Sequence, residues 1–133
     1  MSASIMVSTD LLRELSWALV ITTVIEVVVA LIFRTGWRGA TAVALVNLVT
    51  NPIANLLMLG ISEFAPPPAD SALLLLAVAL EALIVLIEWR LLVWALADTV
   101  GRPRRLLALA SAANVTSLVA GGFVLFTLAD LWA

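Results

Sequence analysis

The sequence predicts an all-α membrane protein, a bundle of four transmembrane helices that forms a single membrane domain over residues 1–133. Hydrophobic residues make up 64% of the chain and only 12% are charged, about half the charged share of a typical soluble domain. The apolar residues also come in long blocks. Each block is close to the roughly 20 residues with which a helix crosses about 30 Å of hydrocarbon. We therefore expect no separate soluble domain.

Four residue types are missing from the chain: cysteine, histidine, tyrosine and lysine. Their absence excludes disulfides, thiolate or imidazole metal sites, haem ligation, Schiff bases and Ser-His-Asp catalysis. We therefore expect neither an enzyme nor a cofactor. Nucleic-acid binding is also not expected, because the seven positive charges are divided between loops and helices and form no basic face.

The predicted membrane spans cover roughly residues 15–33, 40–61, 72–96 and 106–128. Polar or arginine-containing segments at 34–38, 62–70 and 98–105 separate them, and the middle segment contains three consecutive prolines. The first span is followed by arginines and not by a small-residue cleavage site. It is therefore predicted to be a retained helix and not a signal peptide.

Arginine distribution predicts the orientation in the membrane. The segments 34–38 and 98–105 contain arginines, whereas 62–70 contains none. The positive-inside rule then places the two arginine loops in the cytoplasm and both termini outside, as in a multi-pass protein of a bacterial inner membrane. Trp17 and Trp132 would lie near the outer interface, and Trp37 and Trp94 near the inner one.

The second half of the chain looks like a diverged copy of the first. Two-helix hairpins would cover about residues 15–61 and 72–128. Glu26 corresponds to Glu88, and Asn47 corresponds to Asn114. The Glu-to-Asn separation is five residues longer in the second half, which the turn at 98–105 would absorb. Both hairpins insert the same way round, so a pseudo-two-fold axis along the membrane normal is expected.

These four polar residues are predicted to share one level, slightly to the cytoplasmic side of the bilayer centre. A charged residue at such depth costs about 2.5–3.5 kcal/mol on insertion scales, and it normally faces a bundle interior or a wet cavity. Glu26, Glu88, Asn47 and Asn114 are therefore the main candidates for a cation- or proton-binding site. The identity of any metal ion stays open.

Four further residues extend this candidate site. Thr50 and Asn51 recur on the face of Asn47 at helical spacing and would orient the carboxyl groups or complete an oxygen shell. Glu81 lies two turns from Glu88, roughly 10 Å away. It could pass a proton or cation along the bundle, or hydrogen-bond an asparagine in protonated form. Arg90 is a candidate charge partner of Glu88 from a neighbouring helix or a second subunit, or it snorkels to the interface.

Pro52 interrupts the second span. A proline inside a helix removes one backbone hydrogen bond and frees a carbonyl about four residues earlier, here near Leu48. Such a carbonyl beside the asparagines would be an oxygen ligand for an ion. The alternative is an ordinary proline kink, which neighbouring helices readily accommodate.

The segment Val46-Asn-Leu-Val-Thr-Asn-Pro-Ile-Ala-Asn55 resembles a group of small bacterial four-helix membrane proteins with an Asn-x-x-Thr-Asn-Pro second helix. This resemblance implies the architecture and a prokaryotic membrane. The chain is also similar to the small multidrug resistance transporters in size and in having a mid-helix glutamate, Glu26. It differs from them in its second acidic helix with Glu81 and Glu88.

Three functional hypotheses follow. The first is a membrane protein, expected to act as a homodimer in the lipid bilayer, that binds a cation or proton and takes part in ion or small-solute transport. The second is a structural or accessory subunit whose polar residues specify helix packing or partner binding. The third is a membrane enzyme that acts on lipid with a carboxylate as its base.

Overall fold

The computed structural model describes residues 9–64, 70–98 and 102–132 of the chain. Within these residues it contains no strand and four helices: α1 (Thr9–Ile32), α2 (Gly36–Phe64), α3 (Asp70–Ala95) and α4 (Pro103–Trp132). The predicted all-α architecture of four helices is thereby confirmed. Each predicted span coincides with one helix, and every helix begins before the predicted start of its span.

The connection between α1 and α2 is a compact helix cap. Arg34 adopts the left-handed conformation with a φ of 55°. The N–H groups of Arg34 and Thr35 donate to the carbonyl oxygens of Leu31 and Ala30 at 2.9 and 3.2 Å. This is the hydrogen-bond pattern of a Schellman motif, which satisfies carbonyl groups at the end of a helix. The new helix then starts at once, with Gly36 at its first position.

The arginine segments are shorter loops than predicted. Because α2 begins at Gly36 and α4 at Pro103, Arg38, Arg104 and Arg105 lie in the first turns of helices and not in loops. Proline suits the first position of a helix, since its fixed φ is already helical and its missing N–H would have no partner there. The prediction of arginine-containing loops was wrong on this point.

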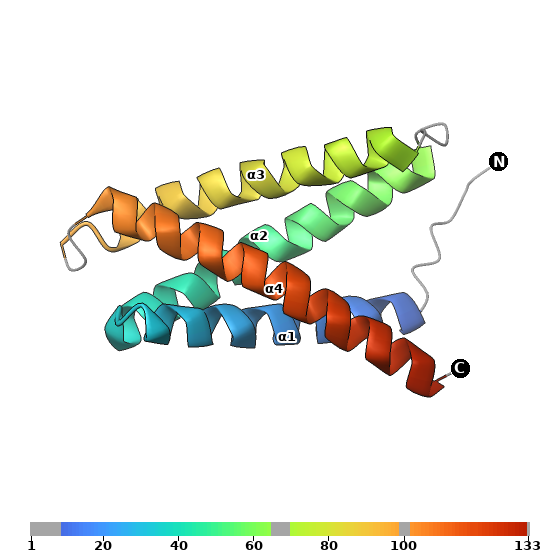
Figure 1. The fold of residues 1–133 in the computed structure, drawn as a ribbon, viewed down its shortest axis with the longest axis horizontal. Coiled ribbons are helices and arrows are strands. Elements are labelled where there is room, and N and C mark those ends of the chain that lie inside the picture. The colour runs from blue at the N-terminus through green and yellow to red at the C-terminus, as the bar shows by residue number, and fades with distance from the viewer. Residues whose placement is uncertain (1–8, 65–69, 99–101, 133) are drawn as a thin grey trace.

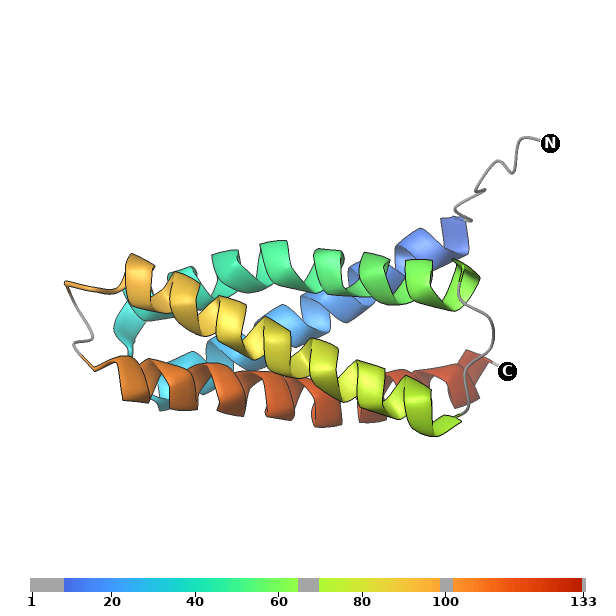
Figure 2. The same ribbon diagram turned by 90° about the horizontal axis from the view of Figure 1, so that it is seen from above.

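The helices form a bundle in which α1 packs against α2 and α4, and α3 also packs against α2 and α4. In Figure 1, α4 passes in front of α2 in the view, whereas Figure 2 shows these two helices on opposite sides of the bundle. One end of the bundle holds the α1–α2 and α3–α4 connections, and we call it the connection end. The other, the terminal end, holds both ends of the chain (Figure 2), and the helices lie farther apart there (Figure 1).

The buried apolar core lies entirely toward the connection end. Among the described residues it consists of ten hydrophobic side chains, none exposed by more than 8%, which we call the apolar seal: Val29, Ala30, Ala40, Val43, Leu92, Leu96, Leu106, Leu109, Ala110 and Ala113. On every helix these residues lie between the connection end and the glutamate or asparagine expected at the predicted site. The small alanines at four of these ten positions allow the helices to approach closely.

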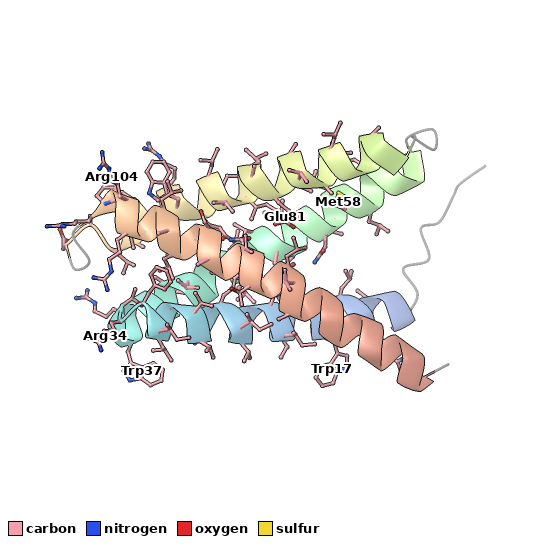
Figure 3. All side chains as sticks on the ribbon, viewed as in Figure 1. Trp17, Arg34, Trp37, Met58, Glu81 and Arg104 are labelled. Atoms are coloured by element: carbon pink, nitrogen blue, oxygen red, sulfur yellow. The ribbon has the colours of Figure 1, made fainter. Side chains whose placement is uncertain are left out.

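Within the part of the chain that the structure describes, two helices are long and apolar enough to cross a membrane by length and composition, α1 over Leu15–Ile32 and α2 over Gly36–Ile61. Arg34, Trp37 and Arg104 lie at the connection end, and Trp17 lies toward the terminal end (Figure 3). The side chain of Trp132, also expected at an interface, is outside the described residues.

Candidate functional site

Six buried polar side chains from all four helices meet beside the apolar seal. None of them is exposed by more than 8%. We call this group the polar layer: Glu26 from α1, Asn47 and Thr50 from α2, Glu88 from α3, and Asn114 and Ser117 from α4. The structure therefore brings together the glutamates and asparagines that the sequence placed at one level.

Glu88 is held by two neighbouring helices. The Thr50 hydroxyl donates to Glu88 Oε1 at 2.6 Å, and Asn114 Nδ2 donates to Glu88 Oε2. The same Nδ2 group also donates to the backbone carbonyl of Ala110 at 3.0 Å. Both carboxyl oxygens of Glu88 thus accept a hydrogen bond, and these bonds tie α3 to α2 and α4.

Glu26 is held less firmly. Its described hydrogen bond comes from the Ser117 hydroxyl, which donates to Oε1 at 3.2 Å. The Ser117 hydroxyl also lies 3.0 Å from the backbone carbonyl oxygen of Asn114. A hydroxyl has a single hydrogen to donate, so these two acceptors compete for it. The Thr50 hydroxyl is shared in the same way, since it also lies 3.1 Å from the carbonyl oxygen of Val46. Glu88 is held more firmly because it has a second described donor, Asn114.

Asn47 lies in the polar layer with an unused donor. Its side chain is only 1% exposed and is close enough to the Glu26 carboxyl to interact with it. However, Nδ2 of Asn47 meets no acceptor with hydrogen-bond geometry among the described residues. A buried donor without a partner costs about 1–3 kcal/mol, so this position is unusual in an otherwise bonded layer.

A second set of polar residues continues from the layer toward the terminal end. Asn55 Nδ2 donates to Asn51 Oδ1 at 2.7 Å, and Asn51 Nδ2 donates in turn to the hydroxyl of Thr22. Glu81, on the facing helix α3, is half-buried at a similar distance from the layer. Asn51 was expected to complete a shell around the glutamates, but its described bonds go to Thr22 and Asn55 instead.

These residues surround one pocket of about 250 Å³. Its apolar wall includes Ala18, Ile21, Ala54, Ile84 and Leu118. Its polar lining comes from all four helices: Thr22, Glu26, Asn47, Asn51, Asn55, Glu81, Glu88, Asn114 and Ser117. Thr50 does not line the pocket, but its hydroxyl holds the lining residue Glu88 by a hydrogen bond.

The pocket and the apolar seal lie on opposite sides of the polar layer along the bundle. Every lining residue belongs to the polar layer or lies on its terminal side, whereas the seal lies on its connection side. Glu81, which lines the pocket, is placed between the two ends of the bundle (Figure 3). The seal therefore separates the pocket from the connection end.

The three glutamates of the pocket share one electrostatic environment. The carboxyl groups of Glu26 and Glu88 interact with each other, and Glu81 interacts with both. Like charges repel strongly where water is scarce, so a proton or a cation in the pocket relieves this repulsion. The described residues contain no group of three or more Asp, Glu, His or Cys side chains with the geometry of a metal site.

Two groups that the sequence analysis considered for the site, the Arg90 side chain and the carbonyl freed by Pro52, do not line the pocket. Arg90 is exposed and its guanidinium lies 6.0 Å from the ring centroid of Trp89, so it forms no ion pair with Glu88 within this chain. A pairing through a second subunit stays a prediction. Helix α2 continues through Pro52, and neither Pro52 nor Leu48 lines the pocket. The carbonyl freed by the proline therefore supplies no ligand to the site.

Three pocket residues were not among the sequence candidates. Ser117 bonds Glu26, and Thr22 and Asn55 continue the polar lining. The sequence did contain a signal for each, because they share helical faces with Asn114, Glu26 and Asn51. Periodicity alone could not separate them from the packing residues on the same faces.

Comparisons of the chain with models of protein families, with curated proteins and with solved structures found no match. The class of protein defined by fold and site is thus a four-helix bundle with a carboxyl-lined pocket next to a buried apolar core.

Proposed function

We propose that this chain is a multi-pass membrane protein that binds a cation or proton in the carboxyl-lined pocket and takes part in the transport of ions or small solutes. The single observation that carries the proposal is the pocket itself. Carboxyl groups from α1 and α3 share it with amide groups from α2 and α4, and intramembrane carboxyls in such cavities commonly mark ion or proton pathways.

The outer surface of the bundle supports a membrane location. Large apolar side chains are exposed on all four helices, among them Val24, Leu56, Leu75 and Val119, which are 57–71% exposed. Extended apolar surface of this kind is rare on soluble monomers. The helices contain 24 to 30 residues, and about 20 suffice to span hydrocarbon.

The distribution of arginine and tryptophan supports the orientation. Arg34, Arg38, Arg102, Arg104 and Arg105 are all exposed and belong to the connection-end segments. The positive-inside rule places that end in the cytoplasm. Both termini and the pocket opening then face the outside of a bacterial inner membrane. Trp37 and Trp94, which are 78% and 83% exposed, suit the inner interfacial belt.

The one-sided pocket suits a transport step. A cation or proton from outside would reach Glu81 first and the polar layer second, and the apolar seal would block its exit. Release to the cytoplasm would require the seal to open while the terminal end closes. The two hairpins pack together through the α1–α4 and α2–α3 contacts, and these provide the interface about which one hairpin would rock against the other.

The test is flux in proteoliposomes. The purified protein is reconstituted with an internal pH dye, and gradients of H⁺, Na⁺ and K⁺ are imposed in turn. The wild type is expected to move protons or one of the ions, and Glu26→Gln and Glu88→Gln are expected to reduce that movement. Asp98→Asn is the matched control, because it makes the same chemical change at an exposed carboxyl outside the pocket. Equal flux in wild type and both pocket variants would refute the proposal.

A structural or accessory role is the second candidate, favoured by one observation. The bonds of Glu88 to Thr50 and Asn114 join three helices, as packing determinants do in membranes. In that case, Glu→Gln changes would lower thermal stability or the recovery of a complex, and would leave ion binding unaffected. A homodimer is the expected unit for either role, and the mass of the purified protein in native mass spectrometry tests it.

A further inference from the structure

The two halves of the polar layer are built from corresponding residues but are bonded differently. In the alignment of the predicted repeat, Glu26 corresponds to Glu88, Asn47 to Asn114, and Thr50 to Ser117. Each glutamate accepts a hydroxyl hydrogen bond from the opposite hairpin, Glu88 from Thr50 and Glu26 from Ser117. To this extent the two halves are equivalent.

The amide groups break the equivalence. Asn114 Nδ2 donates both to Glu88 and to the Ala110 carbonyl oxygen, so both of its hydrogens have acceptors. Asn47 Nδ2 has none within the described residues, although Asn47 is 1% exposed, lines the pocket and lies beside Glu26. The Asn47 amide therefore approaches Glu26 but without the hydrogen-bond geometry with which Asn114 holds Glu88.

The two carboxyl groups show the same difference, because Glu88 accepts more described hydrogen bonds than Glu26. Both oxygens of Glu88 accept hydrogen bonds, whereas the described bond of Glu26 reaches Oε1 and leaves Oε2 for an occupant of the pocket. A carboxyl group with an uncommitted oxygen, next to an amide with an uncommitted hydrogen, presents one acceptor and one donor to the same space.

We propose that the Glu26–Asn47 half exchanges its occupant while the Glu88–Asn114 half stays fixed, and that the occupant places an oxygen acceptor against Asn47 beside the positive charge that it brings to Glu26. The proposal rests on the proposed cation or proton site and assigns its two halves different tasks. A bare metal ion on the amide hydrogens of Asn47 would meet the positive end of the amide dipole. The acceptor oxygen is therefore a hydration water of a proton or inorganic cation, or a hydroxyl of a small organic cation.

Pocket size limits the organic alternative to small molecules. The volume of about 250 Å³ is below the roughly 300–1,000 Å³ typical of drug-sized ligands. It is well above the space that a single water needs. Ethanolammonium, which combines a cationic donor with a hydroxyl, is a suitable probe. Ethylammonium has the same charge without the hydroxyl and is its matched control.

The fixed and exchanging halves can be compared without any ligand. The chain contains four asparagines and no glutamine, so a nitrogen–proton NMR spectrum has only four side-chain amide groups to assign. We expect the Asn47 amide to exchange its hydrogens with solvent at least about tenfold faster than the Asn114 amide, because two acceptors hold the latter. Equal protection of the two amides, or stronger protection of Asn47, would overturn the proposal.

Binding measurements test the chemistry of the occupant. Calorimetric titrations use NaCl, KCl, ethanolammonium chloride and ethylammonium chloride as probes. For any probe that binds, we expect Glu26→Gln and Asn47→Leu to weaken binding about tenfold or more, about 1.4 kcal/mol, with Glu88→Gln weakening binding less than Glu26→Gln does. If only the inorganic salts bind, the occupant is a hydrated ion. If ethanolammonium binds and ethylammonium does not, the acceptor oxygen is the hydroxyl of a small organic cation.

Asn47→Leu tests the donor role of this side chain without adding a charge. Unchanged affinity in Asn47→Leu, or a larger loss in Glu88→Gln than in Glu26→Gln, would contradict the proposal. If no probe binds and no flux is found, the proposed function fails, whereas the amide exchange contrast still decides whether the two halves differ.

Discussion

The hydroxyl of Thr50 on α2 donates a hydrogen bond of 2.6 Å to the carboxyl group of Glu88 on α3. Glu88 is 4% exposed and Thr50 is 7% exposed, so water does not replace this contact in the isolated bundle. A threonine from one predicted hairpin thus holds the glutamate of the other, and the equivalent pair, Ser117 and Glu26, does the same in reverse at 3.2 Å.

Thr50→Val should destabilise the protein. Valine keeps the shape of threonine but removes the donor, so Glu88 Oε1 stays buried without this partner. Losing a hydrogen bond to a charged group costs about 1.5–3 kcal/mol, and a lower thermal unfolding temperature in detergent would report it. Thr116→Val is the matched control, because Thr116 is exposed on α4. Equal unfolding temperatures for the two variants would contradict the assigned role of Thr50.

Leu109→Ala should open a cavity in the apolar seal. Leu109 is fully buried, and Leu→Ala changes at such sites cost about 2–5 kcal/mol. Leu118→Ala removes the same atoms from a side chain that is 58% exposed and should cost much less. Thermal unfolding of both variants measures the difference. A similar loss in both would show that Leu109 contributes no more to packing than a surface leucine.

Single cysteines should reveal the one-sided access. The chain has no natural cysteine, so each introduced thiol is the only one present. Ala54→Cys lies in the pocket wall and should react with a membrane-impermeant maleimide added from outside. Ala113→Cys lies in the seal, 2% exposed, and should resist the reagent from both sides. Labelling of Ala113→Cys from the cytoplasmic side would contradict the proposed closure.

Two residues at the α1–α2 connection adopt a left-handed backbone conformation, and substitutions at these two positions should have opposite effects on stability. Arg34 has a φ of 55° and Gly36 a φ of 67°, and this conformation costs a residue with a side chain about 1–2 kcal/mol. Arg34→Gly should therefore stabilise the protein by about 0.5–1 kcal/mol after allowing for the greater freedom of glycine in the unfolded chain. Gly36→Ala should destabilise it by about 1 kcal/mol. Thermal unfolding that moves both variants in the same direction would refute this.

Much of the bundle could be predicted because its signals are local. Four blocks of apolar residues predicted four helices, and all four exist. Residues at helical spacing, such as Asn47 and Asn51, predicted a polar face, and both line the pocket. Helix boundaries were less accurate, because Pro103 and the cap at Arg34 allow helices to begin inside segments that hydropathy assigns to loops.

Contacts between helices could not be predicted in the same way. Arg90 was a plausible partner for Glu88, yet Thr50 and Asn114 bond that carboxyl group instead. The carbonyl near Leu48 was a plausible ligand, yet it does not line the pocket. Both outcomes depend on how far each helix is rotated about its axis and where it crosses its neighbours, which a helical period does not specify.

The sequence alone determined that four apolar helices form and that glutamates and asparagines occur at matching positions along them, because helix length and period are properties of each segment. The tertiary structure alone decided that Asn114 completes its half of the polar layer while Asn47 does not, and that the apolar seal lies on the connection side of that layer. The reason is geometric: crossing and spreading of the helices set the distances between groups from different segments, and hydrogen bonds and closed packing depend on tenths of an ångström in those distances.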